Sequence, residues 1–167
     1  MSFTSMIYPE DMEEFYELVK LQVQGLTEDV PYFIANMSNI SALLNDALDN
    51  INWVGFYFMK NGKLVLGPFQ GKPACIEIEI GRGVCGTAVK EDQIQLIQDV
   101  HQFPGHIACD SASNSEIVIP MHVNGNIVGV LDIDSPMIGR FTEADRDGLK
   151  NIVEMIESME WFREAFV

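Results

Sequence analysis

A strong fold signal in this chain is the segment Glu116-Ile-Val-Ile-Pro-Met-His-Val-Asn-Gly-Asn-Ile-Val-Gly-Val-Leu-Asp-Ile-Asp134. Asn124-Gly125 predicts a hairpin turn between two strands in which apolar residues alternate. A two-residue turn would pair positions whose numbers sum to an odd value, and this would mix the two faces of each strand. A three-residue loop with a bulged glycine gives an even sum, and the hydrophobic pattern favours this register. One face is then wholly apolar and predicts a core: Ile117, Ile119, Met121, Val123, Ile127, Gly129, Leu131 and Ile133.

The opposite face of the hairpin carries Val128 and gathers acids at one end, because the even register places Glu116, Asp132 and Asp134 together. Three neighbouring carboxylates raise one another's pKa unless a cation lies among them. The group is therefore either a solvated strand end or a binding site for a ligand ammonium. Both interpretations remain open from the pattern alone.

The segment just before this hairpin, Gly105–Glu116, is small and polar and contains Cys109. Such a segment next to an apolar sheet predicts a loop over a site. The other two cysteines of the sequence are Cys75 and Cys85. Three cysteines are compatible with a thiol redox cycle, and equally with three buried thiols that have no chemical role. In such a cycle one thiolate becomes a sulfenic acid, a second thiol condenses with it, and an external dithiol resets the disulfide. A protonated His106 would lower the pKa of the Cys109 thiol.

The composition predicts a single domain over residues 1–167. A net charge of −15, from 25 acids and 10 bases, argues against nucleic acid and anionic membranes as partners. No signal peptide is visible at the N-terminus, and no segment approaches the ~20 apolar residues of a membrane span. We therefore expect a cytoplasmic protein, in which cysteines are reduced and catalytic roles are common.

Periodicity predicts an α+β fold, with a central antiparallel sheet of five to six strands between N- and C-terminal helices. Helices are expected at about 9–25, 30–49 and 142–165, and the sheet at about 52–135. Pro9 is expected in the first turn of the first helix and Asp29 at the start of the second. Thr142 and Asp145 predict a capping box for the last helix.

A first hairpin is predicted at Asn61-Gly62. In the strand before it, Trp53, Gly55 and Tyr57 share one face. Two aromatic rings around a glycine predict a hollow that suits a methyl–sulfur group or an ammonium, although such residues are more often simply packed.

The segment Gly81-Arg-Gly-Val-Cys-Gly86 fits the glycine pattern of dinucleotide sites, but hairpins rather than a βαβ unit surround it. We interpret it as a tight turn that places Cys85 near a helix N-terminus. Zinc held by the three cysteines with His101 or His106 is a weaker alternative, because no Cys-x-x-Cys pair is present.

Six segments carry a resemblance over nearly the whole chain: Gly67–Cys75, Gly81–Thr87, Asp99–His101, Gly105–Asp110, Ser113–Ile117 and Gly129–Pro136. With the helix and sheet order, they resemble a GAF domain and, within that class, the free methionine-(R)-sulfoxide reductases. The resemblance implies reduction of free L-methionine (R)-S-oxide to L-methionine, with thioredoxin as reductant and without a metal or cofactor. Members of this family tend to be homodimers.

By this resemblance Cys109 stands where the family forms its sulfenic acid. Cys75 occupies the place of the resolving cysteine, and Cys85 that of a third cysteine able to join disulfide exchange. Which of these two thiols resolves stays open. Ligand-binding acids and aromatic walls of the family are matched by Glu116, Asp132, Asp134, Trp53 and Tyr57.

Chemistry assigns roles within that set. A zwitterionic substrate needs carboxylates for its ammonium, and Asp132 and Asp134 supply them. A protonated Glu116 can donate to the sulfoxide oxygen while Cys109 attacks sulfur. The alternative function is a GAF-type small-ligand or cyclic-nucleotide binding module without catalysis.

Overall fold

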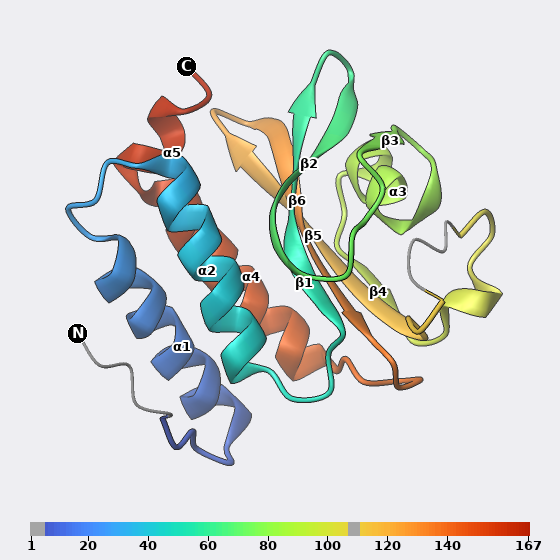
Figure 1. The fold of residues 1–167 in the computed structure, drawn as a ribbon, viewed down its shortest axis with the longest axis horizontal. Helices are drawn as coiled ribbons and strands as arrows, with labels where there is room; N and C mark the ends of the chain where they lie inside the picture. Colours follow the sequence, from blue (N-terminus) through green and yellow to red (C-terminus); the bar gives the residue numbers. More distant parts are fainter. Residues whose placement is uncertain (1–5, 107–110) are drawn as a thin grey trace.

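The structure, a computed structural model, describes residues 6–106 and 111–167. Within these ranges six strands form one antiparallel sheet in the order β3-β2-β1-β6-β5-β4, which confirms the expected α+β fold (Figure 1). The strands are β1 Trp53–Lys60, β2 Lys63–Gly71, β3 Glu77–Glu79, β4 Gln95–Ile97, β5 Ser115–Val123 and β6 Asn126–Ser135. The α-helices are α1 Met12–Thr27, α2 Phe33–Ala47, α3 Gly83–Glu91, α4 Glu143–Ser158 and α5 Glu160–Glu164, and a 3-10 helix, η1, covers Val100–Gln102.

The helices divide between the two faces of the sheet. Figure 1 shows α1, α2 and α4 as one layer on one side, while α3 and the segment after β4 lie on the other. The larger core lies under the three-helix layer and includes Val54, Phe56 and Ile119. A smaller core lies under α3 and includes Trp53 and Tyr57. Among the described helices, none is long and apolar enough to cross a bilayer.

The β5–β6 hairpin has the expected even register over most of its length, since Ile117 pairs with Ile133. The expected turn is wrong, however. Val123 pairs with Asn126 across a two-residue Asn124-Gly125 turn, and an irregularity between Met121 and His122 then restores the even register. That extra step puts Val128, rather than Ile127, in the large core, which corrects the predicted faces near the turn.

The helix ends differ from the expected ones in three places. The first helix, α1, begins at Met12, so Pro9 lies before its first turn, and Asp11 caps it by accepting from the backbone N–H of Glu14 at 3.0 Å. Asp29 lies before α2 with a φ of 60° instead of capping it. The expected single C-terminal helix is broken at Met159, whose extended backbone separates α4 from α5.

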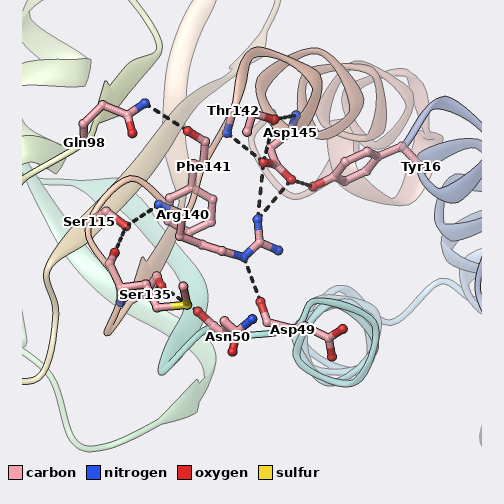
Figure 2. A network of polar contacts seen from close by, with 11 residues as sticks. Tyr16, Asp49, Asn50, Gln98, Ser115, Ser135, Arg140, Phe141, Thr142 and Asp145 are labelled. Atoms are coloured by element: carbon pink, nitrogen blue, oxygen red, sulfur yellow. Dashed lines mark hydrogen bonds and ion pairs between the residues drawn. The ribbon is translucent and has the colours of Figure 1, made fainter. Parts of the chain in front are cut away.

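The start of α4 is joined to three other parts of the fold by a buried polar network (Figure 2). Asp145 and Thr142 form the predicted capping box. The same carboxylate accepts from Tyr16 Oη of α1 at 2.7 Å and from Arg140 Nη1 at 3.3 Å. Arg140 Nε also donates to the carbonyl of Asp49 after α2. This network holds the segment that follows β6 in place. Two of the candidate site acids, Asp132 and Asp134, lie on β6 itself.

Candidate functional site

The three acids predicted to meet do meet on the sheet face under α3. Glu116 of β5 pairs directly with Asp134 of β6, and Val118 pairs with Asp132. Glu116 and Asp132 are each only 6% exposed, while Asp134 is half-buried. A solvated strand end is therefore wrong for this group, because two of its carboxyls are removed from water.

Burial and proximity change how these acids hold protons. Burial, followed by the charges of Asp132 and Asp134, raises the pKa of Glu116 well above its usual range. Burial also raises the pKa of Asp132, to about 6, although hydrogen bonds with Glu116 and Cys85 act in the opposite direction. A hydrogen bond from a protonated Glu116 to Asp132 fits these directions, because it raises the pKa of Glu116 and opposes the rise that burial causes at Asp132.

Strand pairing places the two aromatic residues beside the acids. Trp53 of β1 pairs with Asp134, and Gly55 pairs with Asp132. The rings of Trp53 and Tyr57 are stacked, with centroids 5.9 Å apart. Burial raises the pKa of Tyr57, so the phenol stays protonated and donates to the carbonyl of Cys75 at 3.0 Å.

The expected hollow over Gly55 is wrong. A Cβ built there would lie 2.3 Å from Phe69 Cβ and 2.8 Å from Trp53 Cη2, so packed side chains cover this glycine. Phe69 of β2 stacks on Trp53 with centroids 5.2 Å apart, and it was missed in the sequence. Phe69 could have been found as the aromatic residue that pairs with Gly55 across β1 and β2. The register shift between Gly55 and Tyr57 prevents this pairing from being predicted from the sequence.

The two described cysteines have different settings. Cys109 lies outside the described residues. Of the described pair, Cys75 is half-buried and disulfide-bonded, whereas Cys85 is a buried free thiol near the start of α3. Cys85 Sγ is 3.9 Å from Glu116 Oε1. Burial, and then the charges of Asp132 and Glu116, raise the pKa of Cys85 well above its usual value, so it is a poor nucleophile at neutral pH.

The segment before residues 107–110 reaches Glu116, whereas the segment after them is hydrogen-bonded to Asn52 and to the end of β6. His106 Nε2 lies 3.9 Å from Glu116 Oε2. Burial lowers the pKa of His106, which favours a neutral imidazole over the cation considered from the sequence. After residue 110, Ser113 Oγ accepts from Asn52 Nδ2 at 3.1 Å, and the backbone N–H of Asn114 donates to the carbonyl of Ser135.

The glycine motif forms a turn into α3, as expected. Gly81 and Gly83 have φ values of 83° and 60°, and Gly86 is so close to the Glu79 carbonyl that a Cβ would lie 2.4 Å from it. In the described part of the chain, metal-type ligands gather as Cys85, Glu116 and Asp132. Cys75 and a histidine do not join that group, and Cys109, the third cysteine of the alternative zinc set, lies outside the described residues.

Known proteins share this fold and are similar in sequence over most of the length of the chain. The GAF domain matches residues 30–158. The free methionine-R-sulfoxide reductase of Escherichia coli is 53% identical over 146 residues, which cover 87% of this chain and 88% of that protein. The yeast free methionine-R-sulfoxide reductase, from Saccharomyces cerevisiae, is 41% identical over 152 residues, covering 86% and 84%.

A solved structure extends the likeness to three dimensions. The free methionine-R-sulfoxide reductase of Neisseria meningitidis, in complex with its substrate, superposes with a TM-score of 0.90 at 38% identity. The superposition covers 97% of this chain and 98% of that one. Because sequence and fold agree over nearly the full length, the chain belongs to the free methionine-R-sulfoxide reductases, a family built on the GAF domain.

Proposed function

We propose that this chain reduces free L-methionine (R)-S-oxide to L-methionine. The observation that carries the proposal is the buried pair Glu116–Asp132 in a chain 53% identical to the Escherichia coli reductase. The pair offers one proton and one negative charge in the same site. Reduction of a zwitterionic sulfoxide needs both.

The substrate ammonium is assigned to Asp132 and Asp134. In the described part of the chain, Asp132 Oδ1 is buried without a hydrogen-bond donor, and such an oxygen is costly unless a ligand satisfies it. Trp53 and Tyr57 lie on the same sheet face, beside the acids. Their stacked rings suit the methyl and sulfur of the substrate, because thioethers pack favourably against aromatic rings.

In the proposed first step, the thiolate of Cys109 attacks the sulfoxide sulfur, and Glu116 donates a proton to the oxygen. The substrate S–O bond breaks as oxygen passes to Cys109. Methionine sulfur gains two electrons, and Cys109 loses two as it becomes a sulfenic acid. The raised pKa of Glu116 supports its role as the proton donor.

In the second step, the thiol of Cys75 condenses with the sulfenic acid, forming a disulfide and releasing water. The disulfide-bonded state of Cys75 supports this role, as does the free, buried state of Cys85. The dithiol of thioredoxin then reduces the disulfide by thiol–disulfide exchange and becomes oxidised itself. The cycle consumes one dithiol and releases one methionine.

The proposal is tested by incubating the protein with racemic free methionine sulfoxide and thioredoxin, with its reductase and NADPH. Chromatography should show loss of the R diastereomer and appearance of an equal amount of methionine. A binding module without catalysis would consume neither diastereomer, and a pre-reduced sample mixed with sulfoxide in the absence of thioredoxin would keep all three thiols titratable.

Single-turnover experiments separate the two described cysteines. Cys75→Ser should release about one methionine per protein and then stop, because the sulfenic acid has no resolving partner. Cys85→Ser should continue to turn over with thioredoxin. Mass spectrometry with a sulfenic-acid trap follows the intermediate, and the opposite pattern would make Cys85 the resolving thiol.

A further inference from the structure

Three side chains of metal-ligand type meet beneath α3: Cys85, Glu116 and Asp132. Each offers one ligand atom, and these atoms all lie within 4.8 Å of one another. All three residues are at least nine-tenths buried. They come from a helix and two neighbouring strands, so the fold holds them in place whether or not a ligand is bound.

A second observation points to a cation at this cluster. Asp132 Oδ1 is buried, and among the described residues no donor reaches it. Asp132 forms hydrogen bonds with Glu116 and Cys85, yet within the described part of the chain its Oδ1 atom still lacks a donor. A buried carboxylate oxygen without a donor is stabilised when it coordinates a metal ion or pairs with a cation.

The donor set indicates which class of cation fits. A thiolate with two carboxylates suits zinc, which accepts sulfur and oxygen ligands, and disfavours magnesium and calcium, which prefer oxygen alone. In a tetrahedral site, a Zn–S bond of about 2.3 Å and Zn–O bonds of about 2.1 Å place sulfur and oxygen roughly 3.6 Å apart. The distance from Cys85 Sγ to Glu116 Oε1 is 3.9 Å, close to that value.

We propose that Cys85, Glu116 and Asp132 bind one Zn²⁺ ion and that this ion inhibits the enzyme reversibly. The ionised donors carry three negative charges, which a divalent ion offsets further than a substrate ammonium can. Inhibition rests on the proposed function, because zinc would occupy the oxygens assigned there to the ammonium and to the proton donor. Binding of the metal does not depend on that function.

The binding test uses Co²⁺ as a spectroscopic substitute for zinc. The sequence has three cysteines, so a Cys75→Ser/Cys109→Ser protein keeps Cys85 as its single thiol. Anaerobic titration should give a thiolate-to-cobalt charge-transfer band that saturates at one equivalent and disappears when Zn²⁺ displaces Co²⁺. Adding Cys85→Ser should abolish the band, and adding Asp132→Asn should weaken binding at least tenfold.

The matched control is Glu79→Gln, an exposed acid of β3 that pairs with Lys63, and it should leave the band and the affinity unchanged. Absence of the band, or a band that survives Cys85→Ser, would overturn the proposal. Circular dichroism of each variant establishes that a lost band does not reflect a lost fold. Glu116→Gln provides a second ligand variant that should also weaken cobalt binding.

Kinetics keep the two proposals apart. Zn²⁺ should inhibit the wild-type protein competitively with methionine sulfoxide, and a chelator should restore the full rate. A protein that turns over but gives no cobalt band would refute the metal site alone. One that gives the band but reduces no sulfoxide would refute the proposed function alone.

Discussion

The proton on Glu116 depends on its surroundings rather than on the residue type. An exposed glutamate is ionised at neutral pH, whereas burial beside Asp132 and Asp134 raises the pKa of Glu116 and favours its protonated form. Its hydrogen bond to Asp132 lets the pair share one negative charge. Such an arrangement is typical of acid–base pairs whose environments separate their pKa values.

Glu116→Gln should therefore lower kcat by roughly 10²–10⁴ and change KM by no more than a few-fold, because an amide keeps the shape but donates its proton poorly. In the wild type the rate should fall as pH rises through the raised pKa of Glu116, since the acid form is then lost. Steady-state rates against pH check both expectations. A large rise in KM with kcat preserved would make Glu116 a binding group only.

For single residues, the sequence predicts well which side chains lie next to one another. It predicts less well how closely they pack. The period of two places Glu116 opposite Asp134 once the register is known. The hollow at Gly55 could not be excluded, because Phe69 reaches it from β2 across an irregular pairing. Burial of Asp132 likewise depends on α3, which packs over this face of the sheet. No local sequence pattern predicts where α3 packs.

The hairpin of β5 and β6 shows how far the sequence predicts a whole structural element. Alternating apolar residues predict the even register, and most of the hairpin has it. They do not distinguish a three-residue loop from a two-residue turn followed by an irregularity, since both give the same faces for Ile117 and Ile133. Only residues between the irregularity and the turn differ, and there Val128 replaces Ile127 in the core.

This difference predicts unequal costs for two neighbouring truncations. Val128→Ala should reduce the free energy of unfolding by about 1.5 kcal/mol, because it removes two buried carbon groups from a side chain that is 9% exposed. Ile127→Ala, at a half-buried position outside the large core, should cost less despite removing more atoms. Urea denaturation with unchanged m-values measures both. A larger loss for Ile127→Ala would support the three-residue loop instead.

On the scale of the whole molecule, the network at the start of α4 links elements far apart in the chain. Asp145 is buried and accepts from Tyr16, Arg140 and the backbone N–H of Thr142 (Figure 2). Removing one partner of such a network leaves the remaining polar groups buried without compensation. The contacts join α1, the end of α2 and the segment after β6.

Asp145→Ala should therefore destabilise the protein by about 3–5 kcal/mol and lower Tm by roughly 10 °C. Asp147→Ala is the matched control, because Asp147 lies on the same helix in an exposed ion pair with Arg146 and should cost less than about 1 kcal/mol. Differential scanning calorimetry compares the two. Equal losses would mean that the network does not join these elements.

Stability of the whole protein should also depend on pH through Asp132. Its pKa is about 6 in the folded protein against an ordinary 3.8, so between these values the folded state keeps a proton that the unfolded state has released. Stability is then highest below pH 4 for this group and falls as pH rises through 6. A shift of about two units corresponds to about 3 kcal/mol.

The net charge of −15 also favours unfolding as pH rises, so the test is a difference between proteins. Asp132→Asn cannot ionise at this position, and its stability relative to the wild type should increase by about 2 kcal/mol between pH 4 and pH 7. Glu79→Gln, which removes an exposed charge, should show a nearly constant difference in the same urea titrations. A constant difference for Asp132→Asn as well would mean that Asp132 ionises normally in the folded protein. In that case an ionised Asp132 would not destabilise the folded state, and a bound cation would have no such destabilisation to remove.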